Sequence, residues 1–108
     1  MGRQVTSFGT EGVSNRTLIA SATLVAGERI FANTTAGPFT LTLPSTPADG
    51  ATIQIIDVAG TFRTNNVTVA RGGEKIQNLA EDLTLNLNNA AITMIYSGST
   101  FGWVFVGP

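Results

Sequence analysis

Residues 38–44 read Pro-Phe-Thr-Leu-Thr-Leu-Pro, and after a short connection residues 52–57 read Thr-Ile-Gln-Ile-Ile-Asp. In the first stretch the phenylalanine and both leucines alternate with threonines, which is the two-residue period of a half-buried β-strand. The connection, residues 45–50, contains a proline and an Asp-Gly pair, which reverse a chain with little strain. The two stretches therefore predict a β-hairpin with one apolar face.

The chain from residue 28 onward repeats this pattern of short strands and tight turns. Further strand-like segments occur at residues 29–33, 67–69, 83–87, 91–96 and 102–106. No segment of ten or more residues shows the 3.6-residue period of an amphipathic helix. About eight short strands at close spacing predict an all-β domain, either a compact antiparallel β-sandwich or a barrel-like fold.

The composition points to an unusually uncharged surface. The chain has 108 residues, which suits one domain with a single core. Charged residues make up 12%, about half of the roughly 25% that is usual for soluble domains. The protein therefore either presents Thr, Asn, Ser and Gly to water or buries surface in an oligomer.

Charge and hydropathy argue against two classes of partner. The formal net charge is −1 and the six basic residues are scattered, whereas phosphate neutralisation needs clustered Lys and Arg. We therefore expect no nucleic-acid partner. The apolar runs are far shorter than the roughly 20 residues that cross a bilayer, and no hydrophobic signal segment follows Met1. We expect no membrane partner and synthesis in a cytoplasm.

The sequence lacks the side chains that most enzymes and metal sites use. It contains neither His nor Cys, which excludes Ser-His-Asp and Cys-His catalysis and the usual zinc and copper ligands. Glu81 and Asp82 are the one adjacent pair of carboxylates, and adjacent residues on an extended chain point apart. We predict that the protein is not an enzyme and has no catalytic residue, no cofactor and no metal site.

The first 25 residues differ from the rest and are predicted to form an extended N-terminal arm, with the β domain spanning residues 26–108. The arm is rich in Gly, Ser and Thr and shows no periodicity over its first 17 residues. It is either a frayed terminus or a segment that orders on a neighbouring protein. On the second interpretation its spaced apolar residues are the docking anchors for that neighbour, namely Val5, Phe8, Val13 and Leu18.

Residues 53–56 and 103–106 depart from simple alternation because apolar side chains point to both faces of the strand. A strand that is apolar on both sides must be covered on both sides. The cover is a second layer of the same chain, a neighbouring subunit or a bound ligand. For the second case we predict a subunit interface made of Ile53, Ile55, Ile56, Val104 and Val106.

Three aromatic residues near the C-terminus, Tyr96, Phe101 and Trp103, are candidates for stacking on a sugar, although such residues more often close the core of a small sandwich. Thr40 and Thr42 form a single Thr-x-Thr unit, whereas an ice-binding face needs a regular series of them.

Several strand and turn segments between residues 26 and 106 together form a recognisable pattern. They are Ala26–Ile30, Phe39–Pro44, Pro47–Gly50, Ile53–Asp57, Asn66–Val69, Gly73–Ile76, Leu83–Leu85 and Ile95–Gly98, followed by Trp103. This pattern, covering about three-quarters of the chain, resembles a small β domain of tailed-bacteriophage virion proteins. It is found in head decoration (cement) proteins and in fibre and spike proteins. The resemblance implies a homotrimer and offers no catalytic residue to carry over.

The resemblance leads us to expect a viral structural protein that decorates a bacteriophage capsid. On this expectation a homotrimer binds the major capsid protein on the outer capsid surface of the virion and stabilises the head, with the N-terminal arm reaching the capsid. Multivalent attachment would turn weak single contacts into stable binding. The alternative is a receptor- or glycan-binding module of a phage tail fibre or spike.

Overall fold

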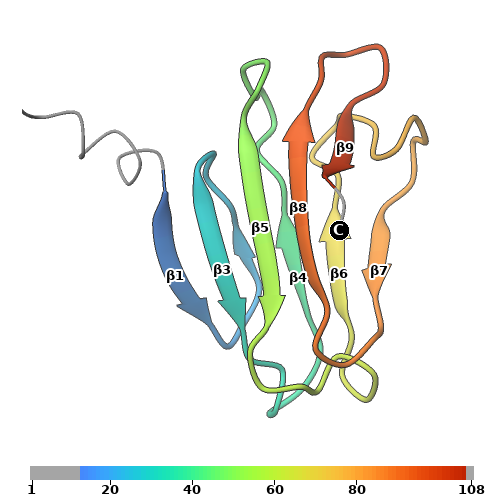
Figure 1. Ribbon diagram of the computed structural model, residues 1–108. Coiled ribbons are helices and arrows are strands. Elements are labelled where there is room, and N and C mark those ends of the chain that lie inside the picture. The colour runs from blue at the N-terminus through green and yellow to red at the C-terminus, as the bar shows by residue number, and fades with distance from the viewer. Residues whose placement is uncertain (1–12, 107–108) are drawn as a thin grey trace, which may run out of the picture.

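A computed structural model describes residues 13–106 and shows two packed β-sheets (Figure 1). The described residues contain nine strands and no helix, so the prediction of an all-β sandwich is confirmed. The strands are β1 Ser14–Leu18, β2 Ala22–Thr23, β3 Glu28–Ala32, β4 Phe39–Thr42, β5 Thr52–Asp57, β6 Val67–Ala70, β7 Leu83–Leu85, β8 Ala91–Tyr96 and β9 Trp103–Val106.

The first six strands wind alternately through the two sheets. The five-stranded sheet has the order β1-β3-β5-β8-β9, and the four-stranded sheet has the order β2-β4-β6-β7. Strands β1, β3 and β5 are parallel to one another, as are β2, β4 and β6, so the chain makes three turns of a flattened coil. Strands β7, β8 and β9 then pair antiparallel and close the sandwich (Figure 1).

The predicted hairpin between residues 38–44 and 52–57 is wrong. Strand β4 pairs with β6 in one sheet and β5 pairs with β3 in the other. The nine residues between Thr42 and Thr52 cross from sheet to sheet, a gap of about 10 Å that a tight turn does not span. Two-residue alternation shows which side chains are buried, but it carries no information about the direction of the partner strand. Four of the seven strand pairs formed by the described residues are therefore parallel where antiparallel pairing was expected.

The described part of the predicted arm belongs to the sandwich. Strand β1 pairs with β3 over five residues, and the short β2 pairs with β4. Leu24 is buried in the core with 2% of its surface exposed. Residues 14–25 thus form the first turn of the coil, which does not match an arm ending at residue 25. The predicted arm anchors Val5 and Phe8 lie outside the described residues.

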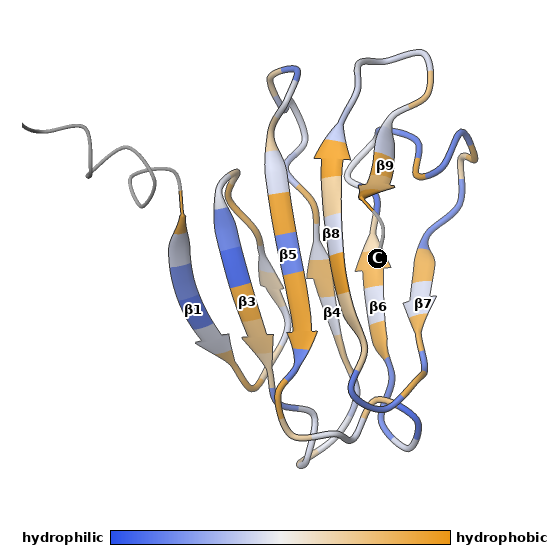
Figure 2. Cartoon of the chain, in the orientation of Figure 1, coloured by the Kyte–Doolittle hydropathy of each residue, from blue (hydrophilic) through white to orange (hydrophobic). Residues whose placement is uncertain are grey.

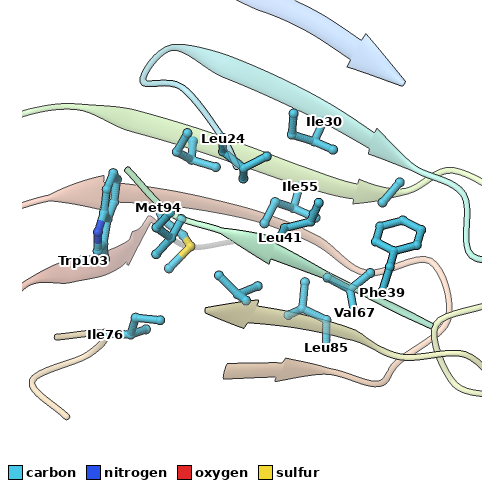
Figure 3. Close-up of a cluster of buried hydrophobic side chains, with 14 of the residues drawn as sticks. Leu24, Ile30, Phe39, Leu41, Ile55, Val67, Ile76, Leu85, Met94 and Trp103 are labelled. Atoms are coloured by element: carbon cyan, nitrogen blue, oxygen red, sulfur yellow. The ribbon is translucent and has the colours of Figure 1, made fainter. Parts of the chain in front are cut away.

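The core lies between the two sheets and follows the alternation of each strand (Figure 3). Ile30, Ile55 and Met94 project from the five-stranded sheet. They face Leu41 and Val67 of the four-stranded sheet, and all five side chains are fully buried. Each such side chain contributes roughly 1.5–3 kcal/mol when it leaves water. Figure 2 shows the same alternation as hydrophobic and polar bands along the strands.

One end of the sandwich is closed around a buried carboxylate. Asp57, at the end of β5, is 4% exposed and accepts three main-chain hydrogen bonds. The donors are the N–H groups of Thr61 at 3.1 Å, Phe62 at 3.0 Å and Asn89 at 2.9 Å. A buried carboxylate is tolerated when its oxygens are satisfied in this way. Asp57 therefore fixes two loops and holds Phe62, which is fully buried, in the core.

Candidate interaction surface

The predicted subunit interface is divided between the two faces of the five-stranded sheet. Along β5, Ile53 and Ile55 point inward and are completely buried in the core, so the assignment of these two residues to an interface is wrong. The four-stranded sheet of the same chain covers them, which is the second-layer alternative. Ile56 follows them on β5 and points to the opposite side, where it is half-buried.

Val104 and Val106 on β9 lie on the same outward side as Ile56. Their partners in the adjacent strand β8 are Ile95 and Thr93 respectively. Val104 is half-buried, whereas Val106 is 46% exposed. Three of the five predicted interface residues therefore meet on one surface, which we call the outer face: the side of the five-stranded sheet that points away from the core.

The strand register places polar side chains in one row across the outer face. Asn15, Arg29, Gln54 and Thr93 occupy matching positions on β1, β3, β5 and β8. Arg29 Nη1 donates to Asn15 Oδ1 at 3.3 Å, and Arg29 Nε donates to Gln54 Oε1 at 2.7 Å. Gln54 Nε2 in turn donates to Thr93 Oγ1 at 2.9 Å. We call this row the polar ladder. Part of it is visible in Figure 2 as the hydrophilic band on β5.

Apolar side chains flank the polar ladder on both sides. Phe31 and Ile56 are paired on one side, and Ile95 and Val104 are paired on the other. All four are half-buried in the described structure. Because the ladder satisfies much of its own hydrogen-bonding capacity, a partner that covers this face needs to supply few polar groups. An apolar surface with locally satisfied polar groups is typical of interface cores.

The opposite surface, on the four-stranded sheet, has a different chemistry. Thr40, Thr68 and Thr84 are matched across β4, β6 and β7, and Thr23 is matched with Thr42 across β2 and β4. We call this surface the threonine face. The threonine face explains how the protein presents a polar surface to water with only 12% charged residues, because hydroxyl groups take the place of charges there.

Two of the three candidate sugar-stacking residues are core residues. Trp103 is fully buried and Tyr96 is 5% exposed, with their ring centroids 5.5 Å apart and their planes tilted by 57°. The Tyr96 hydroxyl donates to Glu74 Oε1 at 2.7 Å. This hydrogen bond, assisted by desolvation and by the negative charge of Glu74, raises the pKa of Tyr96 to about 12. Phe101 alone among the three is exposed, at 55%.

The two described residues of the predicted arm anchors lie in the first turn of the coil. Val13 is 43% exposed just before β1, whereas Leu18 ends β1 and packs against the core. Leu18 is therefore part of the sandwich itself and is not free to reach a capsid.

Residues 13–106 contain no cluster of three or more Asp, Glu, His or Cys side chains that would hold a metal ion. Within the same range, no helix has the length and apolarity needed to span a membrane. The chain matches no protein-family model, and no curated protein matches it.

Proposed function

We propose that this protein is a capsid decoration protein of a tailed bacteriophage, which binds the major capsid protein on the outside of the head as a homotrimer. The family resemblance of residues 26–106 suggests the role and the trimer. The observation that carries the proposal is the outer face, where Ile56, Val104 and Val106 share one side of the sheet with the polar ladder. Its apolar flanks and satisfied polar groups suit permanent contact with another protein.

The size of the outer face sets what it can do alone. Five strands about 4.8 Å apart and roughly five residues long give a flat area of roughly 400 Å². A standard protein interface takes about 800 Å² from each partner. The outer face therefore supplies about half of a stable interface, and the loops that border it supply the remainder.

The proposed mechanism is mechanical. A trimer presents three copies of each capsid-binding element, so weak individual contacts add to a high avidity. Residues 1–12 carry the apolar anchors Val5 and Phe8 and precede the exposed Val13. In this role they reach the major capsid protein while the sandwich holds the three copies together.

The outer face is tested by placing a charge on it. Ile56→Lys puts an ammonium group into one of the two apolar flanks, and Thr68→Lys is the matched control because Thr68 is equally half-buried but lies on the threonine face. We expect Ile56→Lys to be monomeric by sedimentation and to bind purified capsids at least ~100-fold more weakly, since avidity is lost. The control keeps the wild-type mass and binding. A trimeric Ile56→Lys that still binds capsids would refute the proposal.

The N-terminal segment is tested separately by deleting residues 2–12, which leaves β1 intact. We expect the truncated protein to remain a folded oligomer and to lose capsid binding in a co-sedimentation assay. Undiminished capsid binding would remove the docking role from this segment.

The glycan-binding alternative has little support, because two of its three candidate aromatic residues, Trp103 and Tyr96, are buried and Phe101 alone is available to a sugar.

A further inference from the structure

The two edge strands of the five-stranded sheet, β1 and β9, differ in whether their outer main-chain groups are covered. An edge strand carries main-chain N–H and C=O groups that pair readily with another strand, and proteins usually protect such edges. In the described structure β9 is covered by a loop of its own chain, whereas β1 pairs with β3 alone. The difference determines which edge is available to another molecule.

The β9 edge is closed by residues 75–77. Trp103 N–H donates to the Lys75 carbonyl at 2.8 Å, and Gln77 N–H donates to the Trp103 carbonyl at 2.7 Å. The Gln77 side chain then accepts the N–H of Phe105 through Oε1 at 3.0 Å. Gln77 and Asn78 both adopt left-handed conformations, with φ of 51° and 65°, although neither is glycine. Conformational strain is thus accepted where the loop seals this edge.

The β1 edge is open within residues 13–106. Ser14 N–H donates to the Gly27 carbonyl and the Leu18 carbonyl accepts from Asn33 N–H, both at 2.9 Å. Ser14, Arg16 and Leu18 therefore direct their main-chain groups toward β3. Because these directions alternate along a strand, the N–H and C=O groups of Asn15 and Thr17 point away from the sheet.

No unpaired charged side chain of β1 protects this open edge against pairing with another strand. Natural edge strands commonly use a charged side chain to prevent pairing. The one charged residue of β1, Arg16, is turned back over its own chain. Its Nη2 donates to the Thr23 carbonyl at 3.0 Å and to Glu28 Oε1 at 3.1 Å, and its Nε lies 3.0 Å from Glu28 Oε2. The ion pair neutralises the charge and leaves the outward side of β1 without repulsion.

Exposed aliphatic side chains gather on the same first turn of the coil. Val13 is 43% exposed, Ile19 is 70% exposed and Val25 is 62% exposed. They flank β1 and follow β2, so a partner that pairs with the β1 edge lies close to apolar surface as well as to free main-chain groups.

We propose that the β1 edges of two copies pair antiparallel about a two-fold axis and join two five-stranded sheets into one continuous sheet. A second copy of the chain is the partner that fits best, because the charge of Arg16 is neutralised by Glu28 and two such edges therefore do not repel each other. Head-to-tail pairing of β1 with β9 is blocked by the Gln77 loop. With the axis at Arg16, Asn15 of one copy is opposite Thr17 of the other, so all the outward main-chain groups of both residues are satisfied.

The size of this contact predicts when it forms. Five paired residues span about 17 Å, and a two-layer sandwich with its side chains is roughly 20 Å thick, giving roughly 340 Å² for each copy. The area buried on both copies together, roughly 680 Å², is below the 1,200–2,000 Å² of standard interfaces, so the pairing is weak at low concentration. It becomes strong where copies are held close together. It does not depend on the proposed capsid role, because it concerns contact between copies alone.

A disulfide trap tests this pairing. The chain contains no cysteine, so Arg16→Cys introduces a single thiol. Residues facing each other in a non-hydrogen-bonded antiparallel pair have Cα atoms about 4.5 Å apart, which is within reach of a disulfide. The matched control is Thr84→Cys, an exposed thiol on the edge strand β7 of the other sheet. On mild oxidation we expect at least tenfold more covalent dimer from Arg16→Cys, and equal yields would overturn the proposal.

Hydrogen exchange tests the pairing in the wild-type chain, without any loss of the Arg16 ion pair. We expect the amides of Asn15 and Thr17 to exchange rapidly in dilute protein and to become protected at least tenfold as the concentration rises. Rapid exchange at every concentration would overturn the proposal. Protection that is independent of concentration and disappears when residues 2–12 are deleted would assign the edge to the chain's own N-terminal segment instead.

Discussion

The two ends of the sandwich each contain a carboxylate that ties loops together, but the two carboxylates act differently. At one end Asp57 is buried and accepts three main-chain N–H groups. At the other end Glu74 is half-buried and accepts the hydroxyl of Tyr96, which packs against Trp103. The first end depends on hydrogen bonds to a buried charge, whereas the second depends on aromatic packing with one polar contact.

The two ends should therefore differ in how much stability is lost when the carboxylate is removed. Removing the Asp57 carboxylate leaves three N–H donors without an acceptor in a dry environment, and each such group costs about 1–3 kcal/mol. Removing the Glu74 carboxylate leaves one hydroxyl near the surface, where water replaces the lost partner. The Asp57 end is therefore expected to be the more sensitive of the two.

The largest effect is expected from Asp57→Ala. The substitution removes the acceptor of Thr61, Phe62 and Asn89 and releases the loop that holds Phe62 in the core. We expect the free energy of unfolding to fall by about 3–5 kcal/mol, measured by denaturant titration. Asp57→Asn is the control, since its amide oxygen still accepts, and it should lose less. A loss below about 1 kcal/mol for Asp57→Ala would show that water replaces the carboxylate.

A smaller loss is expected from Gly102→Ala at the opposite end. Gly102 has a φ of 76° and lies directly before Trp103, and a Cβ there would overlap the carbonyl oxygen of Lys75. Strain and overlap together should cost about 2–3 kcal/mol by the same titration. Gly73→Ala is the matched control because its φ is 98° but a Cβ there meets nothing within 4 Å. Equal losses for the two variants would mean that the overlap with Lys75 relaxes freely.

The sequence predicts the interior of the sandwich better than its ends. Alternation at Phe39 and Leu41 identifies core residues because burial follows the two-residue period directly. The same period carries no information about the direction of the partner strand, so the sequence does not predict the coil formed by β1 to β6. The polar ladder also depends on register, since Arg29 and Gln54 are 25 residues apart and meet only after β3 and β5 pair.

The features that finish the ends were missed for a different reason. Asp57 resembles any polar residue at the end of a strand, and its three donors come from two loops whose approach no local pattern encodes. Gln77 and Asn78 adopt left-handed conformations without the glycine that usually indicates them. For the interface, the apolar run 53–56 was correctly interpreted as two-sided. However, the choice between a neighbouring subunit and a second layer required the structure.

The smallest expected effect is a loss of stability at high pH, which depends on the hydrogen bond between Tyr96 and Glu74. Tyr96 is the one tyrosine of the chain, so the ultraviolet absorbance of tyrosinate reports on it alone. Its hydrogen bond to Glu74 raises its pKa from the ordinary 10.0 to about 12 in the folded protein. Below pH 10 both the folded and the unfolded chain keep the proton, so this contribution to stability is fully present. Between pH 10 and 12 the unfolded chain loses the proton first, and the contribution falls.

Glu74→Gln is the variant that isolates this effect. It removes the negative charge that holds the proton on Tyr96 but keeps an amide oxygen as acceptor, so the pKa of Tyr96 should move back toward 10.0. Stability at neutral pH should change little, in contrast to the loss expected for Asp57→Ala. Tyr96→Phe supplies the baseline, because its stability should show no decline from tyrosine ionisation over this interval. If wild-type Tyr96 titrates near its ordinary pKa while the chain is still folded, the Glu74 contact does not hold this end together, and aromatic packing closes it unaided.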